Sequence, residues 1–327
     1  MAHLTMEESH FIMGIQNVKA EMNDMRQRKM LQQIRMRWQL FLFILPAFLY
    51  LCMFDYKPMY GIAIAFQDYK LMDGIAGSQY VGLENFMRLF SSYWFPIILK
   101  NTISISLLTL ALSFPLPVIM ALMVNEVRTP WLKKGFQTIS YAPHFISIVV
   151  VCSMVTLFLS PSNGVINRLI ELLGGEAVPF MQNPNMFKWI YVISGIWQNT
   201  GWDAIIYFAA LSSVDPQLLE AADMDGANRI QKIVHVNLPV LVPTIVILFI
   251  LGCGSVLNVG YEKVYLLQNA MNTPGSEVIS TYVYKMGLER NDFSFSTATG
   301  LFNSLINCLV LVVVNGISRR VSETSLW

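Results

Sequence analysis

The sequence predicts an all-α integral membrane protein with about six transmembrane helices. The first observation is its composition: of 327 residues, 54% are hydrophobic and only 13% are charged, whereas ordinary soluble domains carry about 25% charged residues. The second is that the apolar residues form long stretches, each close to the roughly 20 residues that a helix needs to cross a bilayer. The expected surroundings of most of this chain are therefore lipid.

Each predicted span is a stretch almost free of charged residues. The spans cover approximately residues 38–54, 101–124, 136–160, 189–211, 238–261 and 293–318. Only the fourth contains a residue that is charged at neutral pH, Asp203. A cleaved signal peptide is a poor interpretation of the first span, because a long polar segment precedes it and no small-residue cleavage pattern follows it.

The distribution of Lys and Arg predicts the orientation of the spans. Basic residues concentrate before span one, between spans two and three, between spans four and five, and after span six. Because cytoplasmic loops are enriched in these residues, both termini are expected inside the cell. Residues 1–37 are predicted to form a cytoplasmic amphipathic segment at the membrane surface, and residues 38–327 the transmembrane domain. A second amphipathic stretch, residues 83–90, is a candidate for the interface, with packing against the rest of the protein as the favoured alternative.

An ordered cytoplasmic loop is predicted at residues 213–239, between spans four and five. Asp215 followed by Pro216 favours the start of a helix, because Asp is a good N-cap and Pro suits the first helical position. This short helix has an apolar side that it cannot bury in its own chain. Gly226 permits a turn of the backbone, and a second helix from about Asn228 leads into the fifth span. Such a loop is typical of a docking element for another protein.

The residues of this loop carry a resemblance to a known family. The spacing of Glu220-Ala-Ala222, then Gly226, then Val236-x-Leu-Pro239 resembles the EAA loop of permease subunits in binding-protein-dependent ABC importers, although the family usually has Ile where this chain has Val236. The resemblance implies that this loop couples the permease to its ATPase. The coupling residues that it implies are Glu220, Ala221, Ala222, Asp225, Gly226 and Pro239.

Nearly all of the chain after about Arg35 is similar to the carbohydrate permeases of the polysaccharide and lipoprotein-permease group. The similarity is carried by residues 56–69, 81–86, 141–146, 194–197 and 325–327. It implies a type I importer fold with alternating access in a bacterial cell membrane. It also implies a second, related permease subunit, two ATPase subunits, an external solute-binding lipoprotein and an oligosaccharide substrate.

Other functional classes find little support in the sequence. The chain lacks the G-x-x-x-x-G-K-[ST] phosphate loop, so we expect no enzymatic activity, with ATP and Mg bound by the partner ATPase subunits. No catalytic or metal-binding pattern is present, and a net charge of +1 gives no basic surface for nucleic acid. A permease for another solute stays open as an alternative, and so does an ion-driven secondary transporter, although one intramembrane acid and no evident repeat argue against the latter.

Polar residues that interrupt spans four and five are the candidate substrate pathway. Polar groups at membrane depth are costly unless they face protein or a wet cavity, and amides and aromatic faces suit sugar hydroxyls and rings. The alternative is that they hydrogen-bond between helices. Helix packing is also the favoured role of Asn303 and Asn307 in span six, with pathway lining as the alternative. For His144 in span three, packing is favoured over a proton relay. The predicted pathway residues are Trp197, Gln198, Asn199, Trp202, Asp203, Ser255, Asn258 and Tyr261.

Overall fold

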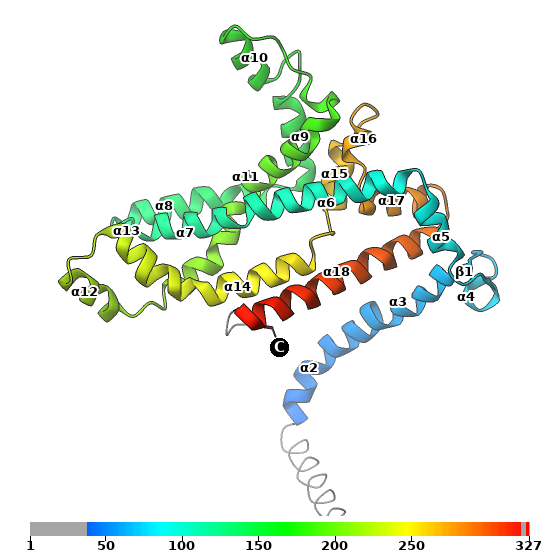
Figure 1. Cartoon of the computed structure of the whole chain (residues 1–327), viewed down its shortest axis with the longest axis horizontal. Helices are drawn as coiled ribbons and strands as arrows, with labels where there is room; N and C mark the ends of the chain where they lie inside the picture. The colour runs from blue at the N-terminus through cyan, green and yellow to red at the C-terminus, as the bar shows by residue number, and fades with distance from the viewer. Residues whose placement is uncertain (1–37, 322–324, 327) are drawn as a thin grey trace, which may run out of the picture. The chain divides into compact units, whose positions relative to one another are not determined.

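The computed structural model describes residues 38–321 and 325–326, and almost all of its regular structure is helical. The predicted amphipathic segment 1–37 lies outside the described residues. The chain separates into two compact units, Met1–Ile62 and Ala63–Trp327. Figure 1 shows the helices of each unit with their labels.

The first unit contributes one long helical segment. Helix α2 (Trp38–Leu51) continues through a π-helical turn (Cys52–Tyr56) and α3 (Lys57–Met59) into a 3-10 segment (Tyr60–Phe66). The stretch with spanning character is Leu42–Phe66, so it extends twelve residues beyond the predicted end at 54. Asp55 and Lys57 do not end the helix because the π turn carries the backbone hydrogen bonds past them.

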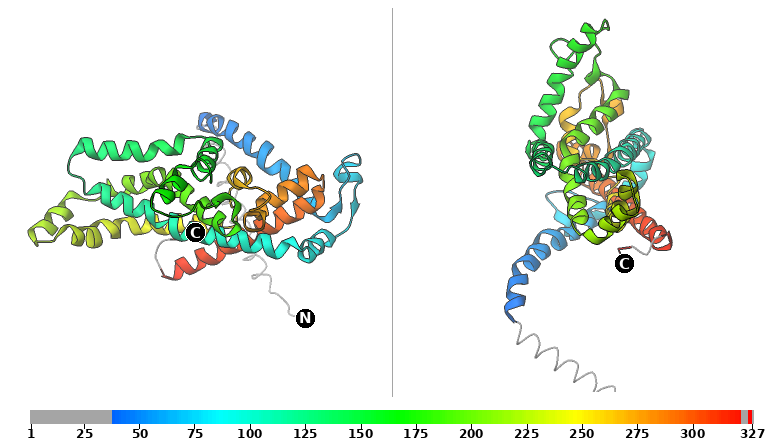
Figure 2. Two further views of the ribbon diagram at one scale, coloured as in Figure 1. Left: turned by 90° about the horizontal axis from the view of Figure 1, so that it is seen from above. Right: turned by 90° about the vertical axis from the view of Figure 1, so that its left-hand side faces the viewer.

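The second unit is built around long helices. They are α6 (Trp94–Ser113), α7 (Pro115–Asn125), α11 (Pro184–Leu211), α14 (Leu238–Gly254) and α18 (Phe293–Val321). Helix α11 packs on α6 and α7, and α14 packs on α18. Figure 2 gives two further views of the chain. Ala121 of α7, Ala204 of α11 and Leu241 of α14 are fully buried in one cluster. These small and branched apolar side chains let the helices approach closely.

The third predicted span is broken. Helix α8 (Pro130–Tyr141) ends in a 3-10 turn (Ala142–Phe145), and α9 (Ile148–Phe158) then departs at 96°. Pro143 lies in the turn, where the residue before a proline disfavours the helical conformation. Gly201 of α11 permits the close approach of this region, because a Cβ atom there would lie 2.1 Å from the carbonyl oxygen of Ser140.

Four helices of the described residues are long and apolar enough to cross a membrane, or five if the bent pair counts as one span. The sequence predicts about six. The difference is α11, the predicted fourth span, which has ample length at 28 residues but whose polar residues lower its hydropathy below that of the others. The fifth span also differs from its prediction: it runs over Arg229–Gly254 and not to residue 261, because the chain leaves the helix after Gly254.

Short elements complete the second unit. Strands β1 (Gln67–Asp68) and β2 (Gln79–Tyr80) pair antiparallel around α4 (Gly74–Gly77). Helix α5 (Glu84–Ser91) confirms the amphipathic stretch predicted at 83–90. Helix α12 lies at the opposite end of this unit from α5 (Figure 1). The remaining elements are α10 (Val165–Leu172), a 3-10 turn (Phe180–Gln182), α15 (Tyr261–Leu267), α16 (Thr273–Ser276), α17 (Ile279–Tyr284) and a π turn (Lys285–Glu289).

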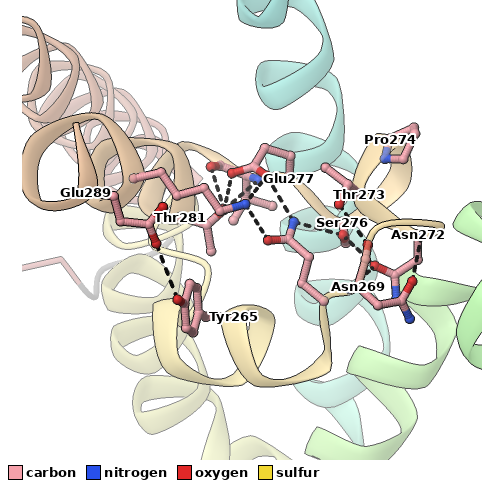
Figure 3. A network of polar contacts seen from close by, with 12 residues as sticks. Tyr265, Asn269, Asn272, Thr273, Pro274, Ser276, Glu277, Thr281 and Glu289 are labelled. Carbon is pink, nitrogen blue, oxygen red and sulfur yellow. Dashed lines mark hydrogen bonds and ion pairs between the residues drawn. The ribbon is translucent and has the colours of Figure 1, made fainter.

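A polar network holds the α15–α17 region in place (Figure 3). The carboxylate of Glu277, only 3% exposed, accepts hydrogen bonds from Lys285 at 2.6 Å, from Gln268 at 3.0 Å and from Thr281 at 3.0 Å. A buried carboxylate is tolerated when it is paired and hydrogen-bonded in this way. The network therefore fixes the end of α15 against α17.

Candidate functional site

A polar cavity of about 560 Å³ lies between α6, α11 and α15. A second cavity of about 290 Å³ shares four lining residues with it and extends to the segment after α14. The shared residues are Thr109, Ser113, Tyr191 and Asp203. Hydroxyl, amide and carboxylate groups line both spaces, so together they can exchange hydrogen bonds with a polar solute.

Six of the eight predicted pathway residues line these two cavities, and they come from three separate parts of the chain. Gln198, Asn199, Asp203 and Tyr261 line the larger one, and Ser255, Asn258 and again Asp203 line the smaller one. The structure therefore brings together residues from α11, α15 and the segment between α14 and α15. The use of these residues in transport stays a prediction.

The two predicted tryptophans lie elsewhere. Trp202 lines a third cavity, of about 690 Å³, together with Asp203, and its ring stacks on His144 at 4.4 Å with an interplanar angle of 4°. Trp197 lies against a separate, mainly apolar cavity of about 720 Å³. Residues two apart on a helix point in widely different directions, so Trp197 and Asn199 cannot face the same space.

The amides of α11 are held by the break in span three. Gln198 donates to the carbonyl oxygen of Ile146 at 3.1 Å, and the Oδ1 atom of Asn199 lies 3.0 Å from Nδ1 of His144. Asn199 also donates to the carbonyl of Gly195 at 3.2 Å. These contacts fit the packing role predicted for His144. They fix the two amides at the cavity wall, where the free lone pairs and N–H groups remain available to a solute.

Asn258 is positioned by span six. Its Oδ1 atom accepts hydrogen bonds from Asn303 at 3.0 Å and from Asn307 at 2.9 Å, and Asn307 in turn accepts from the backbone N–H of Leu257 at 3.0 Å. The predicted packing role of the two asparagines of span six fits these contacts. The irregular backbone after Gly254 thus has a fixed place beside the cavity.

Sequence reasoning missed a polar stripe on α6. Ser106, Thr109 and Ser113 all line the smaller cavity. Ser106 is 7% exposed, and its hydroxyl has no hydrogen-bond partner among the described residues. An unsatisfied buried hydroxyl costs about 1–3 kcal/mol. The signal in the sequence is the spacing i, i+3, i+7 of small hydroxyl residues within an apolar span, which places them on one helix face.

The first half of the predicted coupling loop is α12 (Pro216–Met224), and its start and end have defined caps. Asp215 accepts a hydrogen bond from the backbone of Gln217 at its N-terminus, as the sequence predicts. At its C-terminus, Gly226 has φ +74°, its N–H donates to the carbonyl of Asp223, and Ala227 donates to that of Ala222. This pair of bonds is the Schellman motif, for which glycine is the favoured residue.

The second half begins with α13 (Arg229–Lys232), which continues through a π turn (Ile233–Asn237) into α14. Asn228 and Gln231 form a reciprocal capping box, and Lys232 forms an ion pair with Asp223 of α12. Pro239 is the second residue of α14 and directly follows the π turn, so it lies inside one continuous helical run in which it has no backbone N–H to donate.

The loop presents an apolar surface that the described chain leaves uncovered. Met224 is 89% exposed, Ile230 72% and Leu218 52%. Glu220, Ala221 and Asp225 are exposed beside them, and Ala222 is partly buried. Contiguous exposed apolar side chains rimmed by charge are typical of protein interaction sites.

The chain is similar over most of its length to two proteins of Bacillus subtilis (strain 168). It is 43% identical over 302 residues to the polygalacturonan/rhamnogalacturonan transport system permease protein YteP of Bacillus subtilis (strain 168), with 92% of this chain and 94% of the relative covered. It is 40% identical over 293 residues to protein LplB of the same organism, with 90% and 92% covered.

Solved structures show the same architecture. A chain in the crystal structure of a bacterial ABC transporter involved in the import of the acidic polysaccharide alginate matches with a TM-score of 0.82 and 39% identity, over 90% of this chain and 99% of that one. A chain of the same kind of transporter in complex with alginate pentasaccharide-bound periplasmic protein matches with a TM-score of 0.83. The predicted type I permease fold is confirmed by these matches.

The family comparison agrees with the resemblance inferred from residues 220–239. The model of the binding-protein-dependent transport system inner membrane component family matches residues 113–323, which include the predicted coupling loop, α11 and most of the cavity wall. This chain therefore belongs to that family of membrane permeases, the translocating subunits of ABC importers.

Proposed function

We propose that this chain imports an oligosaccharide across a bacterial cell membrane as one of two related but non-identical permease subunits. The observation that carries the proposal is the polar cavity, lined by Asn199, Asp203 and Tyr261 within a chain whose relatives are named for polysaccharide and oligosaccharide transport. A neutral or charged sugar that leaves water needs replacement hydrogen bonds, and these side chains supply them.

An external solute-binding lipoprotein delivers the sugar in this proposal. The relative with a periplasmic protein bound to alginate pentasaccharide supports this partner. The cavity of this chain needs only modest affinity, because a translocation site has to release its cargo after the conformational switch. A ligand biases that switch only through its different affinity for the two states.

Two ATPase subunits, with ATP and Mg, supply the energy through the coupling loop. The exposed apolar side of α12 and α13 suits a groove on such a partner, and the caps on both helices make the loop stiff enough to transmit motion. The coupling residues Glu220, Ala221, Ala222, Asp225, Gly226 and Pro239 keep the roles that their sequence pattern implies. In this proposal the loop and both termini are on the cytoplasmic side.

Reconstitution tests the proposal. The permease, its genomic partner permease, the ATPase subunits and the binding protein are placed in liposomes, and uptake of labelled oligosaccharides is measured with and without ATP. Uptake that requires both ATP and the binding protein supports the proposal. Uptake that follows an ion gradient without ATP contradicts it and favours a secondary transporter.

A further inference from the structure

A buried cation borders the larger cavity. Lys263 of α15 is 8% exposed, and its ammonium group donates a hydrogen bond to the carbonyl oxygen of Tyr191 at 2.8 Å. The same group lies 4.7 Å from the centroid of the Tyr191 ring. A Cβ atom on Gly195 would approach Nζ to 3.2 Å, so the ammonium lies directly against α11. Both Gly195 and Lys263 line the cavity.

This cation has no acidic partner in the part of the chain that the structure describes. The ion pairs found there join Arg88 to Asp292, Lys232 to Asp223, and Lys285 to Glu277. An ammonium group has three N–H donors, and among the described residues Lys263 uses one of them, toward an uncharged carbonyl. Buried charges are normally paired, because isolating a charge from water is costly. The cavity therefore has an uncompensated positive charge on its wall.

The acids that line the same cavity do not neutralise Lys263. Glu262 is the preceding residue of α15 and is exposed to solvent, and neither Glu262 nor Asp203 forms an ion pair with Lys263. Gly195, beside the ammonium, and Asp203 are eight residues apart on one face of α11, which corresponds to roughly 12 Å along a helix. The cavity thus has a cationic end at α15 and an anionic end at Asp203.

We propose that Lys263 pairs with a carboxylate of the transported sugar, so that the solute is an acidic, uronate-containing oligosaccharide. This inference rests on the proposed function and adds the chemical class of the substrate. A solute carboxylate supplies the missing counter-charge and accepts the unused N–H donors in a charge-assisted hydrogen bond. Asp203 at the other end repels a carboxylate, so the sugar is oriented with its acidic group toward α15.

The test compares an acidic sugar with its neutral form in the assembled complex with its binding protein in proteoliposomes. The probes are trigalacturonate and its fully methyl-esterified form, which keeps the rings and hydroxyls but removes the charges. The variants are Lys263→Gln and Lys263→Arg. The matched control is Lys100→Gln, which changes an exposed lysine of α6 that lies outside the lining of both cavities.

The expected result is that the parent complex takes up trigalacturonate and that Lys263→Gln lowers this uptake at limiting sugar by roughly tenfold or more, the size typical of a lost charge-assisted hydrogen bond. Lys263→Arg, which keeps the charge, should retain most of the uptake, and Lys100→Gln should behave like the parent. Uptake of the ester should change less than that of the acid in Lys263→Gln.

Two outcomes overturn the inference while leaving oligosaccharide import intact. One is that Lys263→Gln assembles and takes up trigalacturonate as the parent does, which makes Lys263 only a brace between α15 and α11. The other is that the parent takes up the ester in preference to the acid, a comparison that decides the matter even if Lys263→Gln does not assemble. If the parent moves neither sugar although the binding protein stimulates its ATPase activity, the proposed function fails as well.

Discussion

At the scale of the residue, the backbone angle of Gly226 decides how α12 ends. Its φ of +74° closes α12 in the Schellman motif, and a Cβ atom placed there meets no heavy atom within 4 Å. The need for glycine is therefore conformational and not steric. A left-handed conformation costs an L-residue roughly 1–2 kcal/mol, whereas Asn tolerates it better than other side chains do.

We expect Gly226→Val to uncouple the complex, because a β-branched residue resists φ of +74° and shifts the helix start at Asn228. Gly226→Asn should retain coupling. The measurement is ATPase activity stimulated by the sugar-loaded binding protein in the assembled complex, with basal ATPase activity as the control for assembly. Equal stimulation in Val and Asn variants would show that the turn has no part in coupling.

Pathway residues should show small individual effects. Alanine at Asn199, Asn258 or Tyr261 removes one solute contact, and a net hydrogen bond contributes about 0.5–1.5 kcal/mol, so each change should lower uptake at limiting sugar by roughly tenfold or less. Membrane abundance and basal ATPase activity report on folding. Three variants that assemble and transport like the parent would assign this cluster to helix packing.

The charge on Lys263 predicts a pH dependence. Burial lowers the pKa of Lys263, which lies in α15 outside the spanning helices, to about 8. Below that pH the ammonium form dominates, and one unit above it only about a tenth remains charged. Uptake of an acidic sugar should therefore fall as the pH rises through about 8, whereas Lys263→Arg should show no such fall.

Other titratable side chains lie near Lys263 or line the same cavity, so the experiment needs a control for their titration. They are Cys152 of α9, Tyr191 of α11, Glu262 of α15 and Asp203 at the far end of the cavity. Because Lys263→Arg leaves all of these groups unchanged, a fall in uptake that persists in that variant would assign the titration to one of them and not to Lys263.

At the scale of the element, α6 combines two roles on different faces. Ile98 and Ile105 are buried among other helices, while the stripe of Ser106, Thr109 and Ser113 borders a cavity. A serine hydroxyl without a partner lowers stability unless a solute uses it. Replacing a hydroxyl of this stripe therefore tests whether that hydroxyl serves helix packing or transport.

We expect Ser106→Ala to raise the thermal stability of the detergent-solubilised complex, because it removes an unsatisfied buried hydroxyl, and to lower sugar uptake by up to about tenfold. Melting temperature and uptake are measured on the same preparation, with Ser304→Ala of α18, an exposed serine, as the control. A stability gain without any loss of uptake would exclude Ser106 from the pathway.

At the scale of the whole molecule, the spanning helices have large uncovered faces. In the most apolar window of each, the share of buried residues ranges from 0% for Leu42–Phe66 to 28% for Trp94–Asn125. Lipid covers apolar faces of this kind, but α6 and α11 also contribute polar walls to two cavities. Polar groups at membrane depth need protein or water beside them, and a second permease subunit would supply such protein.

The chain should therefore function only with a second permease subunit. Expressed alone, it should give no binding-protein-stimulated ATPase activity when mixed with the ATPase subunits. Expressed with the permease encoded beside it, it should purify as a complex with activity. Activity from a complex that contains this permease alone would contradict the requirement for a non-identical partner.

The sequence by itself determined the class of the protein, the short capped helix that opens the loop at residues 213–239, and the approximate positions of most spans. These features depend on local signals: apolar length for the spans, and the N-cap Asp215, the turn residue Gly226 and the family spacing for the loop. Such signals act within a few residues, so they can be recognised in the sequence without a structure. The boundaries were less accurate where a π turn or an irregular segment follows a helix, as after residues 54 and 254.

Only the tertiary structure decided which polar residues share a space. Trp197 and Asn199 are near neighbours in sequence but lie against different cavities, because successive residues of a helix face different directions. Ser106 and Lys263 come from segments far apart in the chain and meet α11 only through packing. The charge on the cavity wall thus depends on the helix arrangement, because a lysine becomes a binding group only when its neighbours exclude water and leave it unpaired.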